Sequence, residues 1–245
     1  MPIHAGNIKD KDMVLLMSID GAQLYQSKQS DCWIYIWVIL DFAPDSRYMK
    51  GCVFPGGFIP GPNKPKNVDS YIFPGFHHLA ALMKEGLGIW DAARDITFIP
   101  HPFLHLGTAD GPRMTYLNGL TGHSGAFGCR LYCAVKGHRK EGGNHYYPAL
   151  LKPNDYDVAG CNHNDIDGSH LPSANIVEYE AALRKVLLSW TTAQHEENRK
   201  DTRITKPSIF SGFPTKSTLS VPLCFGADLM HLISLNLTDL LLGLW

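Results

Sequence analysis

Residues 32–42 (CWIYIWVILDF) carry the strongest strand pattern in the chain, because β-branched and aromatic residues dominate this run. A shorter apolar run at residues 14–19 (VLLMSI) precedes Asp20 and predicts a buried strand that ends by projecting a carboxylate. A third strand is predicted over residues 51–59, where a Pro-Gly-Pro-Asn sequence ends the run. The short connections predict an antiparallel meander. Three alternating aromatic side chains are expected to pack in the core from one sheet face: Trp33, Tyr35 and Trp37.

The chain changes to helical spacing after this meander. Apolar residues from Phe76 to Trp90 recur on one helical face and predict an amphipathic helix that packs on the sheet. Residues 96–106 return to a strand-like composition, interrupted by prolines, and lead to a loop that contains Asp110. Strands and helices alternating in this way predict an α/β fold.

Two further helices are predicted in the C-terminal third. Asn175 and Glu178 resemble a capping box at the start of the first helix. Residues 194–206 predict a charged, solvated connection, and the last helix is expected to begin near Ala227. Its apolar end, residues 229–245, is short and too polar for a membrane span, which favours a buried helix and no membrane contact.

The charge balance excludes a globally basic nucleic-acid-binding protein. The chain has 22 basic and 23 acidic residues, a formal net charge of -1, so any contact with DNA must come from a local patch. Residues 136–140 (KGHRK) are one such patch, although a solvated loop is the simpler interpretation. The N-terminus lacks the basic-then-apolar pattern of a secretory signal, which favours a reduced, intracellular setting.

Asp20 and Asp110 are the first candidate site. Each follows a strand-like run and precedes a glycine, which lets the chain leave the sheet at once. If the two runs are neighbouring strands, the carboxylates converge and can bind hard divalent cations for in-line phosphoryl transfer. The simpler alternative is that each Asp-Gly pair forms an ordinary turn.

A cysteine pair in an irregular insertion is the second candidate site. Residues 121–172 are rich in Gly, His, Asn, Cys and Pro and show little periodicity, so they need something other than a hydrophobic core to become rigid. Cys129 and Cys133 can reach one tetrahedral zinc, which would supply that rigidity. Further candidate ligands follow: His138, His145, Cys161 and His163. The alternative is a pair of reduced, partly buried cysteines.

Four segments together resemble the core of DDE transposases of the CACTA (En/Spm) superfamily, particularly the forms seen in fungal genomes. They are SIDGAQLYQSKQSDCWIYIWVILD, GGFIPGPNKPKNVDSYIFPGFHHLAALMKEGLGIWDA, TADGPRMTYLNGLTGHSGAFGCRLYC and DLMHLISLNLTDLLLGLW. The similarity runs from about residue 14 to the end of the sequence, and the IPGP segment and the Asp-x-Pro element followed by the cysteine pair are its most specific parts.

This resemblance implies an RNase H-like mixed sheet with flanking helices and a zinc-stabilised insertion. Residues 1–120 would be the first part of the catalytic core, 121–172 the Cys/His-rich insertion, and 173–245 a helical region with the C-terminal part of the core. It implies Mg²⁺ or Mn²⁺ at Asp20 and Asp110, and structural Zn²⁺ at Cys129 and Cys133, for which we take His145 and Cys161 as the remaining ligands. The implied activity is cleavage and strand transfer in cut-and-paste DNA transposition, by a nuclear homo-oligomer that binds transposon ends and target DNA.

The third catalytic acid departs from the family pattern. Plant members carry a Glu in an Asp-x-Met-His-x-Glu element, whereas this chain has Ile233 at that place, which leaves Asp228 or an acid beyond Trp245 as the third carboxylate. The missing Glu and the near-zero charge favour a second hypothesis, a catalytically inactive, transposon-derived fragment that acts as a zinc-stabilised binding module. An unrelated RNase H-like nuclease is a third.

Overall fold

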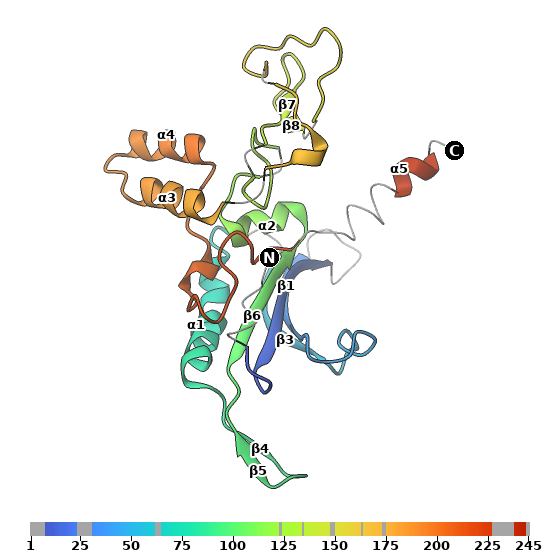
Figure 1. The fold of residues 1–245 in the computed structure, drawn as a ribbon, viewed down its shortest axis with the longest axis vertical. Helices are drawn as coiled ribbons and strands as arrows, with labels where there is room; N and C mark the ends of the chain where they lie inside the picture. The colour runs from blue at the N-terminus through green and yellow to red at the C-terminus, as the bar shows by residue number, and fades with distance from the viewer. Residues whose placement is uncertain are drawn as a thin grey trace.

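A four-stranded mixed sheet forms the centre of the molecule (Figure 1). Its strands are β1 (Met13–Gln23), β2 (Asp31–Ile39), β3 (Val53–Ile59) and β6 (Pro102–Ala109), in the order β3-β2-β1-β6. The antiparallel meander of the first three strands is confirmed, and β6 joins β1 in parallel. The computed structural model describes residues 8–23, 31–61, 65–122, 124–133, 135–147, 150–162, 164–172, 175–226 and 238–243.

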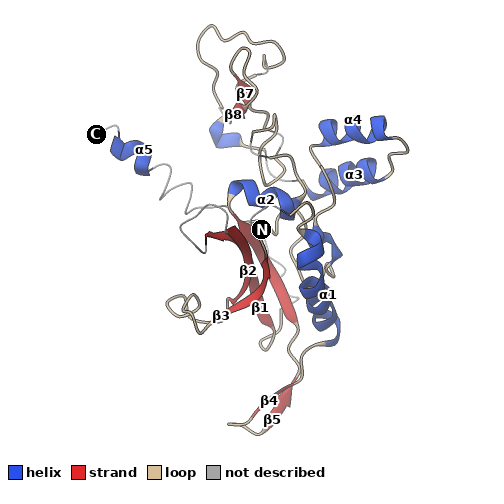
Figure 2. Cartoon of the chain, turned by 180° about the vertical axis from the view of Figure 1, so that it is seen from behind, coloured by secondary structure: helices blue, strands red, loops and turns tan. Residues whose placement is uncertain are grey.

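Helix α1 (Asp69–Glu85) covers one face of this sheet, as Figure 2 shows from behind. Trp33 and Tyr35 are buried on that face, and Trp37 contacts Phe76 with 5.7 Å between ring centroids, so the aromatic alternation serves the core as predicted. The helix begins earlier than predicted because Ile72 extends the buried stripe, and Pro74 is accommodated inside it. It also ends earlier, at Gly86, where a positive φ of 78° suits glycine.

The residues after α1 form a hairpin that projects from the sheet (Figure 1). Strands β4 (Ile89–Asp91) and β5 (Ile96–Phe98) pair with each other alone. Trp90, predicted to end the preceding helix, lies in β4 and is exposed. The single strand predicted over residues 96–106 is divided into β5 and β6, because Pro100 lies between them and a proline has no N–H for a ladder.

The outer edge of β6 is covered by the returning chain. Leu104 N–H donates to Ser217 O and Gly107 N–H donates to Cys224 O, forming isolated bridges with Thr218 and Phe225. The short helix η2 (Ile209–Gly212) places Phe210 against Gly107, where an added Cβ would lie 2.5 Å from the ring. Phe76, Phe210, Phe213 and Phe225 then form one aromatic cluster between α1 and β6.

Helices α3 (Ile176–Leu187) and α4 (Thr192–Thr202) form a hairpin beside the sheet. The predicted cap of α3 is confirmed, since Asn175 Oδ1 accepts hydrogen bonds from the N–H groups of Val177 and Glu178. The prediction of a charged, solvated connection over residues 194–206 was right in that most of the side chains up to residue 201 are exposed, and wrong in that the segment is helical. Most of that segment is α4, which Thr191 caps through a hydrogen bond from Gln194 N–H.

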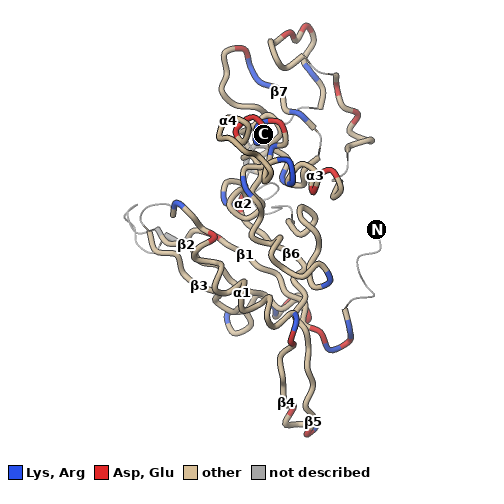
Figure 3. The backbone as a smooth tube through the Cα atoms, turned by 90° about the vertical axis from the view of Figure 1, so that its left-hand side faces the viewer, with Lys and Arg blue, Asp and Glu red and all other residues tan. Residues whose placement is uncertain are grey.

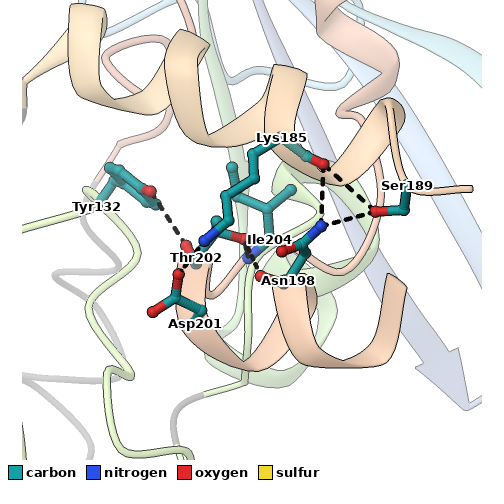
Figure 4. A network of polar contacts seen from close by, with 7 residues as sticks. All are labelled: Tyr132, Lys185, Ser189, Asn198, Asp201, Thr202 and Ile204. Atoms are coloured by element: carbon teal, nitrogen blue, oxygen red, sulfur yellow. Dashed lines mark hydrogen bonds and ion pairs between the residues drawn. The ribbon is translucent and has the colours of Figure 1, made fainter. Parts of the chain in front are cut away.

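Polar contacts hold α4 in place because its sequence has no apolar stripe (Figure 4). Asn198 is buried and its Nδ2 donates to Lys185 O at 3.2 Å and to Ser189 Oγ at 2.9 Å. Lys185 also pairs with Asp201, and the Tyr132 hydroxyl donates to Thr202 O at 3.0 Å. The last contact joins the insertion to the helical hairpin.

The insertion is largely irregular, as predicted. Its regular elements among the described residues are the two-residue strands β7 (His138–Arg139) and β8 (Tyr146–Tyr147) and the short helix η1 (Gly168–His170). Most of the helix expected from Ala227 lies outside the described residues, and α5 (Thr238–Gly243) falls within its predicted C-terminal part. Within the described chain, no helix combines the length and apolarity that crossing a membrane requires.

Candidate functional site

The parallel pairing of β1 and β6 places Asp20 beside Asp110. Ile19 is the register partner of Ala109, and each aspartate is the next residue along its own strand direction. β6 ends directly before Asp110, but β1 continues to Gln23, so the prediction that the first strand ends at Asp20 was wrong. The parallel register still places the two carboxylates side by side. The sequence analysis expected this convergence, and the structure brings the two residues to one place.

Asp110 has a structural role of its own. It is the N-cap of α2 (Gly111–Asn118), and its Oδ1 accepts a 2.8 Å hydrogen bond from Arg113 N–H. Pro112 lies in the first turn, where its missing N–H costs nothing. The aspartate therefore fixes the start of α2 whether or not it takes part in chemistry.

Arg113 joins the two carboxylates. Its Nη1 lies 3.1 Å from Asp20 Oδ1 and pairs with Asp110 Oδ2. The guanidinium also lies over the Trp33 ring, 5.5 Å from its centroid. Gly21 leaves the necessary room, since an added Cβ there would lie 2.1 Å from an Arg113 nitrogen. The sequence analysis missed Arg113, although its i+3 spacing from Asp110 is a pattern typical of helical ion pairs.

The two aspartates differ in exposure. The Asp20 side chain is 64% exposed, whereas that of Asp110 is 16% exposed. Asp20 Oδ1 also accepts a hydrogen bond from its neighbour, Gly21 N–H, at 2.7 Å. Asp20 is thus the carboxylate that a ligand from solvent reaches first.

The two carboxylates are the right kind of ligand for a hard cation and lie close enough together to share one, but Arg113 lies between them. Mg²⁺ and Mn²⁺ favour carboxylate oxygens, but Arg113 already places positive charge between Asp20 and Asp110. A cation bound to both would have to displace this guanidinium. Across the described residues, no three His, Cys, Asp or Glu side chains gather closely enough to hold a metal ion, and Asp228 lies outside those residues.

Cys129 and Cys133 form a close pair of free thiols. The hydrogen bond between their side chains lowers the pKa of Cys129 and raises that of Cys133. Arg203 lies between the rings of Phe127 and Tyr132, 4.5 Å from each centroid, and its Nη1 donates to Cys133 O. The pair is therefore held by the same residues that attach the insertion to the end of α4.

The structure does not assemble the four expected zinc ligands. His145 is exposed, and Cys161 is buried beside Tyr156. Neither joins the cysteine pair in a metal-binding group within the described residues. His138 is also buried, between the rings of Tyr147 and Tyr156, whereas His163 lies outside the described residues.

The basic patch at residues 136–140 holds the insertion together. Lys136 Nζ donates to Gly160 O at 2.9 Å, and Arg139 Nη2 donates to Ala159 O at 2.8 Å. Both side chains thus connect β7 to the loop before Cys161. These contacts favour an internal role over the phosphate contact considered from the sequence.

Comparison with protein-family models and with curated proteins finds no match. The site is therefore interpreted from its own geometry. That geometry consists of two aspartates on neighbouring parallel strands, one within β1 and one directly after β6, bridged by one arginine.

Proposed function

We propose that this protein is a DDE-type enzyme that cleaves and joins DNA with the help of divalent cations, as transposases do. The observation that carries the proposal is the convergence of Asp20 and Asp110 on one nitrogen of Arg113. Residues ninety positions apart meet there because their strands are parallel neighbours. Convergent carboxylates at a sheet end are the ligands that metal-dependent phosphoryl transfer requires.

The sheet supports an RNase H-like assignment within this proposal. Three antiparallel strands are followed by α1 and then by a strand parallel to β1. This order puts the first and fourth long strands side by side, with a helix crossing between them on one face. The sequence resemblance predicts a mixed sheet with flanking helices.

Asp20 and Asp110 would hold the cations. Before a cation binds, Arg113 pairs with both carboxylates. When bound, such cations activate the attacking oxygen and stabilise the leaving oxygen of an in-line displacement. Without them, the single positive charge of Arg113 offsets half of the negative charge of the two carboxylates and keeps them side by side. Asp228 stays a proposal for the third acid.

Replacing either aspartate by asparagine tests the proposal. We expect Asp20→Asn and Asp110→Asn each to reduce Mg²⁺- or Mn²⁺-dependent nicking of DNA with terminal inverted repeats by about 100-fold or more, since metal-ion catalysis is worth several kcal/mol. Asn is as good an N-cap as Asp, so Asp110→Asn keeps the start of α2 and removes only the charge.

Asp45→Asn is the matched control, because Asp45 is exposed in the loop between β2 and β3. It should leave nicking unchanged. Full activity of Asp20→Asn would rule out the proposed role of the pair.

A catalytically inactive binding module is the second candidate, and the Arg113 bridge favours it. If Arg113 is a permanent counter-ion, calorimetric titration with Mn²⁺ will show no binding to the wild type and recovered binding to Arg113→Gln. Binding of Mn²⁺ to the wild type at Asp20, lost in Asp20→Asn, would contradict this alternative. Its zinc component predicts bound Zn²⁺ that is lost in Cys129→Ser, and metal-free folded protein would remove that component.

A further inference from the structure

A cavity of about 710 Å³ opens beside the candidate site. It lies between the segment that leads into α1, the middle of α2 and the chain around the end of α4. We call this cavity the α1–α2 groove. Its polar and charged lining includes Lys66, Asp69, Thr115, Tyr116, Arg199 and Lys206.

Basic and acidic residues are interspersed along the backbone (Figure 3), whereas the lining of the groove has more basic than acidic residues. Lys66, Arg199 and Lys206 face Asp69 as the single acidic residue of the lining. Lys206 pairs with Asp69, and Arg199 pairs with Glu196 outside the groove. Lys66 is exposed at the rim, which leaves its charge available to a ligand.

The start of α1 adds to this positive character. Val68 occupies the N-cap position and provides no side-chain hydrogen bond to the first turn. The first N–H groups of a helix carry partial positive charge and attract anions, and here Asn67 Oδ1 already accepts a hydrogen bond from Asp69 N–H at 3.1 Å. The Asp69 carboxylate offsets part of that charge, and it also forms an ion pair with Lys206.

Two buried atoms in the groove still have unused hydrogen-bonding capacity. Asp69 Oδ1 and Arg199 Nε are shielded from solvent and have no hydrogen-bond partner in the structure. One is an acceptor and the other is a donor. Because neither atom has accessible surface, a ligand in the groove is bound by the exposed parts of the lining instead.

The groove is connected to the aspartate pair through α2 and Trp33. The Tyr116 ring packs edge-on against Trp33 at 5.2 Å between centroids, and Arg113 lies over the same Trp33 ring. Along the helix axis, Asp110 and Tyr116 are roughly 9 Å apart at 1.5 Å per residue. At about 3.4 Å per nucleotide, this spans two to three nucleotides of one strand.

We infer that the α1–α2 groove binds the sugar-phosphate backbone of a nucleic-acid strand, two to three nucleotides from the phosphodiester at Asp20 and Asp110. The inference rests on the proposed function, because it takes the aspartates as the reacting centre. Lys66 at the rim contacts phosphate, and the partly exposed Arg199 and Lys206 side chains line the path of the strand. The exposed rim at Lys66 and Asn67 suits a polymer that passes through rather than an enclosed small molecule.

Binding in EDTA separates this site from the chemistry. We would measure fluorescence anisotropy of a short fluorescein-labelled DNA oligonucleotide over a series of salt concentrations. Lys66→Glu should weaken binding about tenfold, the scale of one charge-assisted contact. Lys66→Ala should lower the slope of log affinity against log salt by about 1, as expected for one lost phosphate contact.

Lys50→Glu provides the same charge change on an exposed lysine in the loop between β2 and β3. It should bind like the wild type, and unchanged thermal melting of both variants would show that folding is intact. Equal affinity of Lys66→Glu and Lys50→Glu would overturn the inference. So would the absence of oligonucleotide binding by the wild type, or displacement of the oligonucleotide by inorganic phosphate at equal phosphate concentration.

The outcomes distinguish the groove from the proposed function. Suppose that Lys66→Glu loses oligonucleotide binding while neither the wild type nor any variant nicks DNA. The groove is then a nucleic-acid site, and the proposed cleavage activity is rejected. If Asp20→Asn abolishes nicking while Lys66→Glu binds and nicks normally, the chemistry stands and the groove is refuted. Asp20→Asn should retain oligonucleotide binding in EDTA, because the charge that it removes repels phosphate.

Discussion

Two regions of the molecule carry potential metal ligands, and they organise them by different means. At the end of the sheet, Asp20 and Asp110 are far apart in sequence and meet because Ile19 pairs with Ala109. In the 121–172 insertion, His145 and Cys161 are much closer in sequence to Cys133, yet they do not join it in one group. Backbone pairing thus brings side chains together more reliably than nearness in sequence.

The two regions also differ in the interactions that stabilise them. The sheet has side chains without solvent contact on several elements, among them Met17, Leu104 and Phe210. The insertion depends on scattered polar contacts, such as the bond from Tyr132 to Thr202 and those of Lys136 and Arg139. We therefore expect substitutions to affect stability very differently in the two regions.

Truncating a leucine in each region should give the largest contrast. Leu104 in β6 has no exposed surface, and Leu104→Ala should lower the free energy of unfolding by about 2–5 kcal/mol through lost burial and a cavity. Leu151 in the insertion is 70% exposed, and Leu151→Ala should change it by no more than about 0.5 kcal/mol. Urea unfolding measures both. Similar losses would show that the insertion has a core of its own.

Removing one hydroxyl should give an intermediate effect at the junction of the two regions. Tyr132→Phe leaves Thr202 O without its buried partner and should cost about 1–2 kcal/mol. Limited proteolysis should then cleave the insertion faster than in the wild type. Tyr147→Phe, at an exposed ring in β8, is the control and should be neutral. Equal cleavage of both variants would mean that Tyr132 does not anchor the insertion.

The smallest effect on stability is expected from lowering the pH, through the Asp167 carboxylate at the start of η1. Hydrogen bonds from the Ser169 side chain, the His170 side chain and the Ser169 N–H lower the pKa of Asp167 from 3.8 to about 2. The contribution of the carboxylate to local structure is therefore present above about pH 4 and is lost as the pH falls through about 2.

An NMR titration of the Asp167 carboxyl should show this low midpoint. Because the Asp167 side chain is 64% exposed and its hydrogen bonds stay within η1, Asp167→Asn should leave the global unfolding midpoint at neutral pH unchanged. A titration midpoint near 4 would show that these contacts do not persist in solution. A shifted unfolding midpoint would show that η1 is coupled to the rest of the fold.

The parts of the fold that follow from local patterns could be predicted from the sequence. The three meander strands and the cap at Asn175 have strong signals in residue type and spacing. The position of Asp110 directly after a strand was also predictable, because β6 is apolar and Asp110 caps the helix that follows it. For Asp20 the prediction was wrong, since β1 continues through Gly21 to Gln23. The distance between Asp20 and Asp110 depended on the parallel register of β1 and β6, which no local pattern encodes.

The parts that depend on tertiary contacts could not be predicted. α4 has no apolar stripe, and its burial depends on contacts such as that of Asn198 with Lys185 on another helix. The insertion has no periodic pattern that could fix where His145 or Cys161 would point. Arg113 is a different case, because its spacing from Asp110 was visible and only its second partner, Asp20, required the fold.

The unequal edges of the sheet limit how copies of this chain can associate. At β6 the edge groups of Leu104 and Gly107 are already bonded to the returning chain, so another strand cannot add there. At β3 no further described strand is paired, and Pro55 and the shift in register opposite Tyr35 and Ile36 leave little room for a regular ladder. Strand addition at the central sheet is therefore confined to the β3 edge, which can join two copies but cannot extend them into an open-ended row.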